Sequence, residues 1–325
     1  RGTQTYAGEV TLSGGDRTLT ATTVNTQSTL AGGTNALTIT GAADIDGAFT
    51  GITNLSISGT SNIGANVTTS GTQSYSGAVT VSAASSLSTT NSDVTLGSSL
   101  TLADNLTITT GAGTGDIAVT GSIDGAKALS LSAGTGAITL SGAVGQTTRL
   151  GALTLNSSGA TTLAQSVKAA SVTSNADGSL RINGGSVDTT GAQTYGEAIT
   201  LGANTTLTGT TINTQSTLAG GGNALTITGA ADIDGAFAGL TNLSVSGASN
   251  IGANVTTTGT QTYAGAVTLS GGDRTLAGST VNTQSTLAGG GNALIITGDA
   301  DIDGAFSGLT NLSVSGTSNI GANVT

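Results

Sequence analysis

Apolar and polar residues alternate in short triplets along the whole chain. Typical triplets are Leu37-Thr38-Ile39, Leu106-Thr107-Ile108 and Leu225-Thr226-Ile227. Strict alternation is the period of a β-strand with one buried and one exposed face. Gly, Asn, Asp and Ser separate the triplets, which is the composition of turns. Since no window keeps a 3.6-residue period, the pattern predicts an all-β protein with essentially no helix.

Three long segments are nearly identical in sequence and in length and form tandem repeat units. They cover residues 2–70, 191–258 and 259–325. A fourth copy opens at Gly71 with GTQSYSGAVTVS and then diverges, so residues 71–190 are expected to form less regular coils. We expect one continuous domain over residues 1–325, because repeats of this kind pack only on their neighbours.

Short strands in tandem repeats predict a right-handed parallel β-helix, which is a β-solenoid. Gly and Ala allow narrow coils to turn tightly. Two triplets per coil give about 20–24 residues per coil and roughly 14–15 coils, which stack at about 4.8 Å to a length of roughly 70 Å. A sandwich with as many strands would need a larger core than these side chains fill.

The composition excludes most site chemistry. The chain has 53 Gly and no Pro, Cys, Met, Trp or His. Without Cys there is no disulfide, thiolate nucleophile or zinc finger, and without His there is no Ser-His-Asp triad. The absence of Pro keeps backbone N–H groups available for strand ladders. We therefore expect no enzyme.

The charge excludes further classes of protein. The net charge is −10 and only 7 residues are Lys or Arg, so a nucleic-acid partner is not expected. No apolar stretch is long enough for a transmembrane segment. The first residues form no basic-then-apolar leader, and we expect any signal peptide to have been removed or to lie upstream.

Aromatic and Asn residues recur at fixed repeat positions. The aromatic set predicts core filling rather than an exposed sugar-binding ladder. Inward Asn ladders, which satisfy the backbone groups of turns, are favoured over ligand contacts. The aromatic positions are Tyr6, Tyr75, Tyr195, Tyr263, Phe49, Phe237 and Phe306, and the Asn positions are Asn25, Asn213, Asn282, Asn66 and Asn254.

An Asp-Ile-Asp-Gly motif gives the only candidate metal ligands. Carboxylates two residues apart in a strand project to one face, where they can hold Ca²⁺. A solvated turn is the simpler interpretation, because calcium-binding β-rolls have denser Gly/Asp repeats. No cofactor is expected for this reason. The candidate residues are Asp44, Asp46, Asp232, Asp234, Asp301 and Asp303.

Two further kinds of site are open alternatives. Paired acids can cleave glycosides, but the acids that do not recur in the repeats form no recognisable motif; these are Asp93, Asp104, Asp116, Asp124, Asp177 and Asp188. Exposed Thr-x-Thr rows, such as Thr38/Thr40 and Thr226/Thr228, are similar to ice-binding surfaces. Their uneven spacing along the sequence argues against a regular array.

Some runs are typical of one group of bacterial proteins. They are TTGAQTY at residues 189–195 followed by AITL at 198–201, GSIDGAKAL at 121–129, and AGTG at 133–136. The chain resembles, over its whole length, the filamentous haemagglutinin-like adhesins and two-partner-secretion exoproteins of Gram-negative bacteria. The resemblance implies a secreted right-handed β-helix on the outer cell surface. Because no secretion-recognition domain is recognisable, the resemblance also implies either an interior repeat region of a longer chain or a processed product.

The sequence thus predicts an extracellular structural fibre or adhesin shaft of a cell surface or biofilm matrix. The last residues, Asn323-Val324-Thr325, run nearly in phase into the GTQ that opens the chain, so we expect head-to-tail stacking of copies into filaments. Other expected partners are surface glycans or proteins of a host or neighbouring cell. The alternative is a repeat-surface binding module for glycan, calcium or ice, and a remote one is a β-helical carbohydrate-active enzyme.

Overall fold

The structure is a computed structural model that describes residues 2–325, and Arg1 lies outside it. None of the described residues is helical, so the all-β prediction is confirmed. The chain divides into two compact units, residues 2–170 and Ser171–Thr325, and each is described by itself. The single continuous domain over residues 1–325 stays a prediction.

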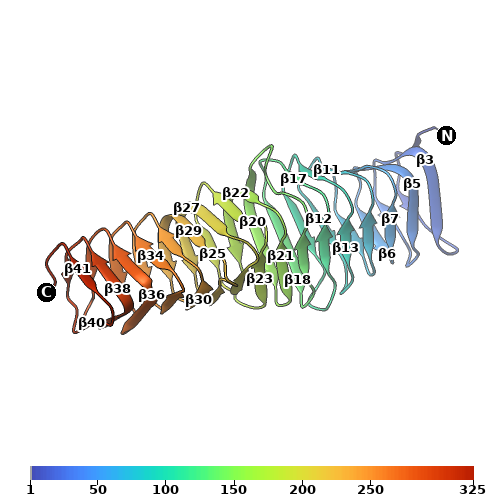
Figure 1. Cartoon of the computed structure of the whole chain (residues 1–325). Coiled ribbons are helices and arrows are strands. Elements are labelled where there is room, and N and C mark those ends of the chain that lie inside the picture. The colour runs from blue at the N-terminus through green and yellow to red at the C-terminus, as the bar shows by residue number, and fades with distance from the viewer. Residues whose placement is uncertain (1) are drawn as a thin grey trace. The chain divides into compact units, whose positions relative to one another are not determined.

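The first unit consists of short strands joined by turns (Figure 1). They are β1 (Gln4–Tyr6), β2 (Val10–Thr11), β3 (Arg17–Thr26), β4 (Leu30–Ala31), β5 (Leu37–Ile45), β6 (Phe49–Ile52), β7 (Leu55–Ile57), β8 (Ser61–Ile63), β9 (Val67–Thr69), β10 (Gln73–Tyr75), β11 (Val79–Val81), β12 (Ser85–Ser88), β13 (Val94–Leu96), β14 (Leu100–Leu102), β15 (Leu106–Thr109), β16 (Ile117–Val119), β17 (Ile123–Asp124), β18 (Leu129–Gly134), β19 (Ile138–Leu140), β20 (Leu150–Ser157) and β21 (Ala160–Leu163).

The second unit is built in the same way, and β22 (Val167–Ser174) includes the residues at its start. Its other strands are β23 (Ser179–Ile182), β24 (Ser186–Thr189), β25 (Gln193–Tyr195), β26 (Ala198–Leu201), β27 (Thr205–Thr214), β28 (Leu218–Ala219), β29 (Leu225–Ile233), β30 (Phe237–Leu240), β31 (Leu243–Val245), β32 (Ser249–Ile251), β33 (Val255–Thr257), β34 (Thr260–Tyr263), β35 (Val267–Leu269), β36 (Arg274–Thr283), β37 (Leu287–Ala288), β38 (Leu294–Ile302), β39 (Phe306–Ser307), β40 (Leu312–Val314) and β41 (Ser318–Ile320).

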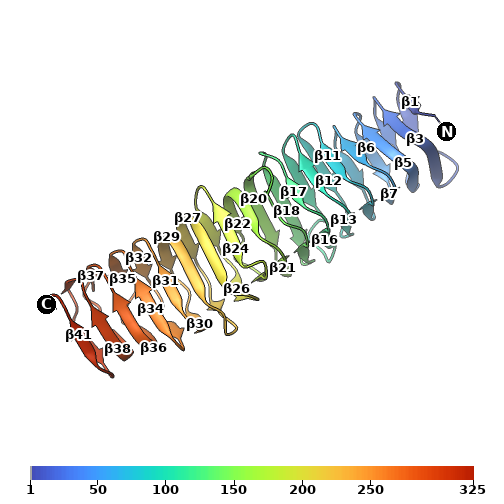
Figure 2. The same cartoon turned by 45° about the horizontal axis from the view of Figure 1, so that its top comes forward.

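The strands of each unit pair in parallel with strands one coil away. In the first unit β5 pairs with β7 and β8, and in the second β29 pairs with β31 and β32 (Figure 2). This pairing is a parallel β-solenoid of about 17 turns with roughly 19 residues per turn. The predicted fold is therefore confirmed, while its right-handedness stays a prediction.

The coils are shorter and more numerous than the spacing of the triplets predicted, so the expected coil length and coil count are both wrong. A short coil leads from Leu37 to its register partner Leu55, and a longer one leads from Leu129 to Leu153. Each coil holds three strand segments rather than two. The sequence pattern missed segments because β3 and β5 each turn a corner inside one strand; in β3 the register shifts between Thr20 and Thr23.

The repeat unit does not contain a whole number of coils. In the first repeat, strands β1–β9 include two that turn a corner, which makes eleven segments, or three coils and two thirds. Gln4 consequently belongs to one ladder, with Val24, while the equivalent Gln73 belongs to another, with Leu55. In the second unit, Gln193 pairs with Ile212 whereas Gln261 pairs with Leu243. Equivalent residues of successive copies therefore lie on different sides of the coil.

The core is a thin row of aliphatic side chains inside each coil. In β5, Leu37 and Ile39 are buried while Thr38 between them is exposed, as the alternation predicts. Tight corners need glycine: Gly229 has a φ of +136°, and a Cβ there would lie 1.9 Å from the carbonyl oxygen of Gly209. Small residues therefore set the narrow width of the coil.

Candidate functional site

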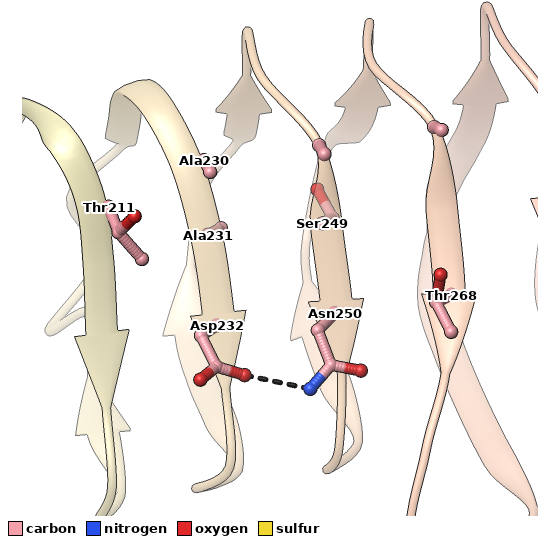
Figure 3. Close-up of a pocket in the computed structure, with 9 residues that line it drawn as sticks. Thr211, Ala230, Ala231, Asp232, Ser249, Asn250 and Thr268 are labelled. Atoms are coloured by element: carbon pink, nitrogen blue, oxygen red, sulfur yellow. Dashed lines mark hydrogen bonds between the residues drawn. The ribbon is translucent and has the colours of Figure 1, made fainter.

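The Asp residues proposed for calcium lie in ladders of side-chain amides. Asp232 in β29 accepts one hydrogen bond from Asn213 Nδ2 at 2.7 Å and one from Asn250 Nδ2 at 2.8 Å. These amides come from the preceding and the following coil, and Figure 3 shows the Asp232–Asn250 bond between adjacent strands. The other copies repeat the arrangement at 2.7–2.8 Å: Asn25–Asp44–Asn62 and Asn282–Asp301–Asn319.

Each ladder uses both carboxylate oxygens of its central Asp. The second Asp of each motif, at Asp46, Asp234 and Asp303, follows the strand end and is exposed. Partial burial and the nearby charge of Asp232 raise the pKa of Asp234. Within residues 2–325, no group of three or more acidic residues is placed to hold a metal ion. A calcium ion would have to compete with two amide donors for each central Asp.

An open groove runs beside two of these ladders. The small side chains of Ala230, Ala231 and Ala248 leave it hollow, and Asp232 and Asn250 border it (Figure 3). The first unit has the equivalent groove beside Asp44, lined by Thr23, Ala42, Ala43, Asp44, Thr60, Ser61, Asn62, Ala78 and Thr80. Chemically the groove offers hydroxyl, amide and carboxylate groups to a polar ligand.

The prediction of inward Asn ladders is wrong for both sets, since Asn66 and Asn254 are exposed, but one of the two sets does satisfy turns. Asn66 Oδ1 accepts from the backbone N–H of Ser86 at 2.8 Å, and Asn254 Oδ1 accepts from that of Thr275 at 2.9 Å, so this set satisfies turns as predicted. The set of Asn25, Asn213 and Asn282 instead lies on the outer side of the strand and donates to Asp. In β3, Asn25 lies between buried Val24 and buried Thr26, so strand alternation turns its side chain outward.

The aromatic residues fill the core, as predicted. Tyr75, Tyr195 and Tyr263 and the three Phe residues are at most 1% exposed, and Tyr6 in the first coil is half-buried. An exposed sugar-binding ladder is therefore wrong. The buried Tyr195 Oη donates to Gln193 Oε1 at 2.8 Å, while Gln193 Nε2 donates to the carbonyl oxygens of Val187 and Thr208. Burial raises the pKa of Tyr195 above its usual range, so its hydroxyl stays a donor.

Several of the acids that do not recur in the repeats have a structural role. Asp93 Oδ1 accepts from the backbone N–H of Asp116 at 2.9 Å, and Asp116 Oδ1 accepts from that of Ala137 at 2.7 Å. Asp124 Oδ1 likewise accepts from the N–H of Thr147 at 2.9 Å. Each bond links a turn to the next coil. Asp104 accepts from the N–H of Asn105, and Asp177 is exposed in a loop.

The Thr rows are more regular than their sequence spacing predicts. Strand pairing puts Thr18, Thr38 and Ser56 in one register column of the first unit, and Thr206, Thr226 and Ser244 in one of the second. Each column contains Ser as well as Thr. The expectation against a regular Thr array and the ice-binding alternative therefore both stay predictions.

Glu197 is a buried acid that the sequence patterns did not single out. It lies in the turn between β25 and β26 and is 1% exposed, and neither carboxylate oxygen has a hydrogen-bond partner other than the nearby Ser174 hydroxyl. Burial raises its pKa to about 7, and the nearby Ser174 hydroxyl offsets only part of this effect. A signal was present: the equivalent position is Gly8, Gly77 and Gly265 in the other copies.

No protein-family profile, curated protein or solved structure matches this chain. The structure itself shows a parallel β-solenoid with tandem repeats.

Proposed function

We propose that this chain is an extracellular structural shaft, a stiff β-solenoid that forms part of a bacterial adhesin or surface fibre. The observation that carries the proposal is the mismatch between repeat and coil. Each repeat unit advances the coil by three and two-thirds turns, so repeated residues face different sides in successive copies. A binding surface needs its repeated residues on one side, whereas a shaft needs only length.

The bonding pattern supports a mechanical role. Parallel ladders join each strand to the coils before and after it, and buried aliphatic rows and polar side-chain ladders follow the same direction. Solenoid stability is a sum over neighbouring repeats, so such a chain gains length without a larger core.

Location and partners rest on the resemblance to filamentous haemagglutinin-like exoproteins. It favours secretion to the surface of a Gram-negative bacterium, a place in cell adhesion or in a biofilm matrix, and contact with surface glycans or proteins. Electron microscopy of the purified protein at rising concentration tests self-association. Filaments that lengthen with concentration support head-to-tail stacking, and single particles of constant length contradict it.

Single-molecule pulling between the chain ends tests the shaft itself. We expect force peaks spaced by whole coils, each releasing about 19 residues or small multiples of that number. Smooth extension at low force would contradict a mechanical role. The Ile39→Asp variant is the control, because a charge in the core removes the peaks of its own coils.

The second candidate is a repeat-surface binding module. The paired grooves beside Asp44 and Asp232 favour it, because the same polar lining occurs in both units. Binding of glycan arrays, or thermal hysteresis in ice, that is lost on substituting groove residues would favour this alternative. No observation favours the carbohydrate-active enzyme.

A further inference from the structure

The turn at Glu197 holds two buried oxygen-bearing side chains that bond to no group outside this pair. Both oxygens of Glu197 are buried, and so is Ser174 Oγ at the end of β22 in the preceding coil, whose hydroxyl is the one neighbour that lowers the pKa of the acid. Both side chains belong to the second unit. An unsatisfied buried carboxyl group is tolerated only when it is neutral, because an isolated carboxylate loses its hydration at great cost.

The other repeats show how this acid comes to be buried. Gly77 occupies the equivalent place in the second copy, where a Cβ would lie 2.4 Å from the backbone of Gly59 in the preceding turn. No side chain fits there. Below Glu197 the preceding coil has the four-residue loop 175–178, where the turn below Gly77 has the three residues 58–60. This loop packs directly against the turn of Glu197, since a Cβ on the neighbouring Gly196 would lie 2.6 Å from the carbonyl oxygen of Asn175.

The charged groups around this turn do not neutralise Glu197. The loop 175–178 carries Asp177, and β23 carries Arg181, and both side chains are exposed. The turn of the following coil, residues 215–217, has no charged residue. Neither carboxylate oxygen of Glu197 is bonded to any of these groups.

We propose that Glu197 makes this turn a pH-sensitive latch of the solenoid: the neutral acid stays packed between coils and holds the 175–178 loop down, and the carboxylate moves to water and releases the loop. The direction follows from proton linkage. The folded state keeps its proton up to about pH 7, while the open state releases it near the usual value for Glu, about 4.3. Closure is therefore fully favourable below that lower value and is progressively lost as the pH rises through 7.

The chain allows a direct measurement, because its only glutamates are Glu9 and Glu197. Protein labelled with ¹³C-glutamate should give two side-chain carboxyl signals, with the exposed Glu9 as internal reference. We expect the second signal to titrate near pH 7 and to disappear in Glu197→Gln. Titration of the Glu197 signal at acidic pH, near the usual value for Glu, would overturn the proposal.

Hydrogen exchange reports the loop itself. After correction for intrinsic rates, opening of residues 175–178 should rise on the order of ten- to a hundred-fold between pH 5 and pH 8. Glu197→Gln should abolish this rise, while Asp177→Asn, which removes the loop's own charge, should keep it. If Glu197→Gln folds poorly, Glu197→Gly restores the residue of the other repeats and should be equally insensitive to pH. A rise that persists in either Glu197 variant, or that is lost in Asp177→Asn, would contradict the latch.

Discussion

At the scale of single residues, a Gln–Tyr pair gives the apolar coil interior its polar contacts. Gln193 uses its amide to satisfy two carbonyl oxygens, and its own oxygen accepts from Tyr195. Sequence alone placed Tyr in the core, since one aromatic residue per several coils is too sparse for an exposed binding platform. Sequence alone did not reveal Gln193 as the partner of Tyr195. That hydrogen bond depends on both side chains of β25 pointing to the inner face of the coil.

Tyr195→Phe tests this pair. It leaves Gln193 Oε1 buried without a donor, so we expect a loss of about 1–3 kcal/mol in stability. Urea unfolding followed by circular dichroism measures it. Tyr6→Phe is the matched control: its bond to Gln4 is 3.3 Å long and only partly buried, so the loss should be smaller. Equal effects in the two variants would count against an energetic role for burial.

The Asp232 ladder makes a second prediction at this scale. Asp232→Ala removes the acceptor of two amides and should cost about 2 kcal/mol. Asp232→Asn should cost less than about 1 kcal/mol, because Asn213 can turn its unpaired Oδ1 toward the new amide. Thermal melting of the three proteins in EDTA and in millimolar Ca²⁺ measures both effects. A calcium-dependent rise in the wild-type Tm that both variants lack would instead support a metal site.

At the scale of the strand, alternation was a sound guide to burial and a poor guide to coil length. Leu37-Thr38-Ile39 reads as in–out–in and is so in the structure. The following Gly41 has a φ of +130° and makes the corner at which β5 changes face, so that β5 pairs with β7 before it and with β8 after it. A single Gly inside a strand is a weak turn signal, so the alternation pattern missed this corner.

Ile39→Asp and Thr38→Asp form a matched pair in β5. Ile39 is fully buried, and an unpaired carboxylate there should cost more than about 4 kcal/mol and unfold its own and adjacent coils. Thr38 is exposed, so the same charge one residue earlier should change stability by less than about 1 kcal/mol. Circular dichroism and limited proteolysis distinguish the two. Similar behaviour of both variants would mean that the inward and outward faces of β5 are wrongly assigned.

At the scale of the molecule, fold and repeats follow from sequence while function does not. Repeats predicted the solenoid because each unit can bury its apolar face only on a neighbour. The predicted candidate sites were judged from residue type alone, and the structure shows that half of the candidate acids join one coil to the next, as Asp93 and Asp232 do. In the sequence, a polar side chain that hydrogen-bonds to the next coil cannot be distinguished from one that binds a ligand.

The fractional advance of the repeat gives a prediction about length. A second copy of residues 191–258, inserted after Thr258, adds eleven strand segments, and every segment still meets a near-identical partner one coil away. We expect the variant to fold with an unchanged circular dichroism spectrum per residue. The second unit should grow by about 18 Å, which is three and two-thirds coils at about 4.8 Å each. Small-angle scattering measures the change in maximum dimension, and an insert of the same composition in scrambled order is the control. Growth in width rather than length, or equal growth with the scrambled insert, would mean that the repeats do not add coils to a shaft.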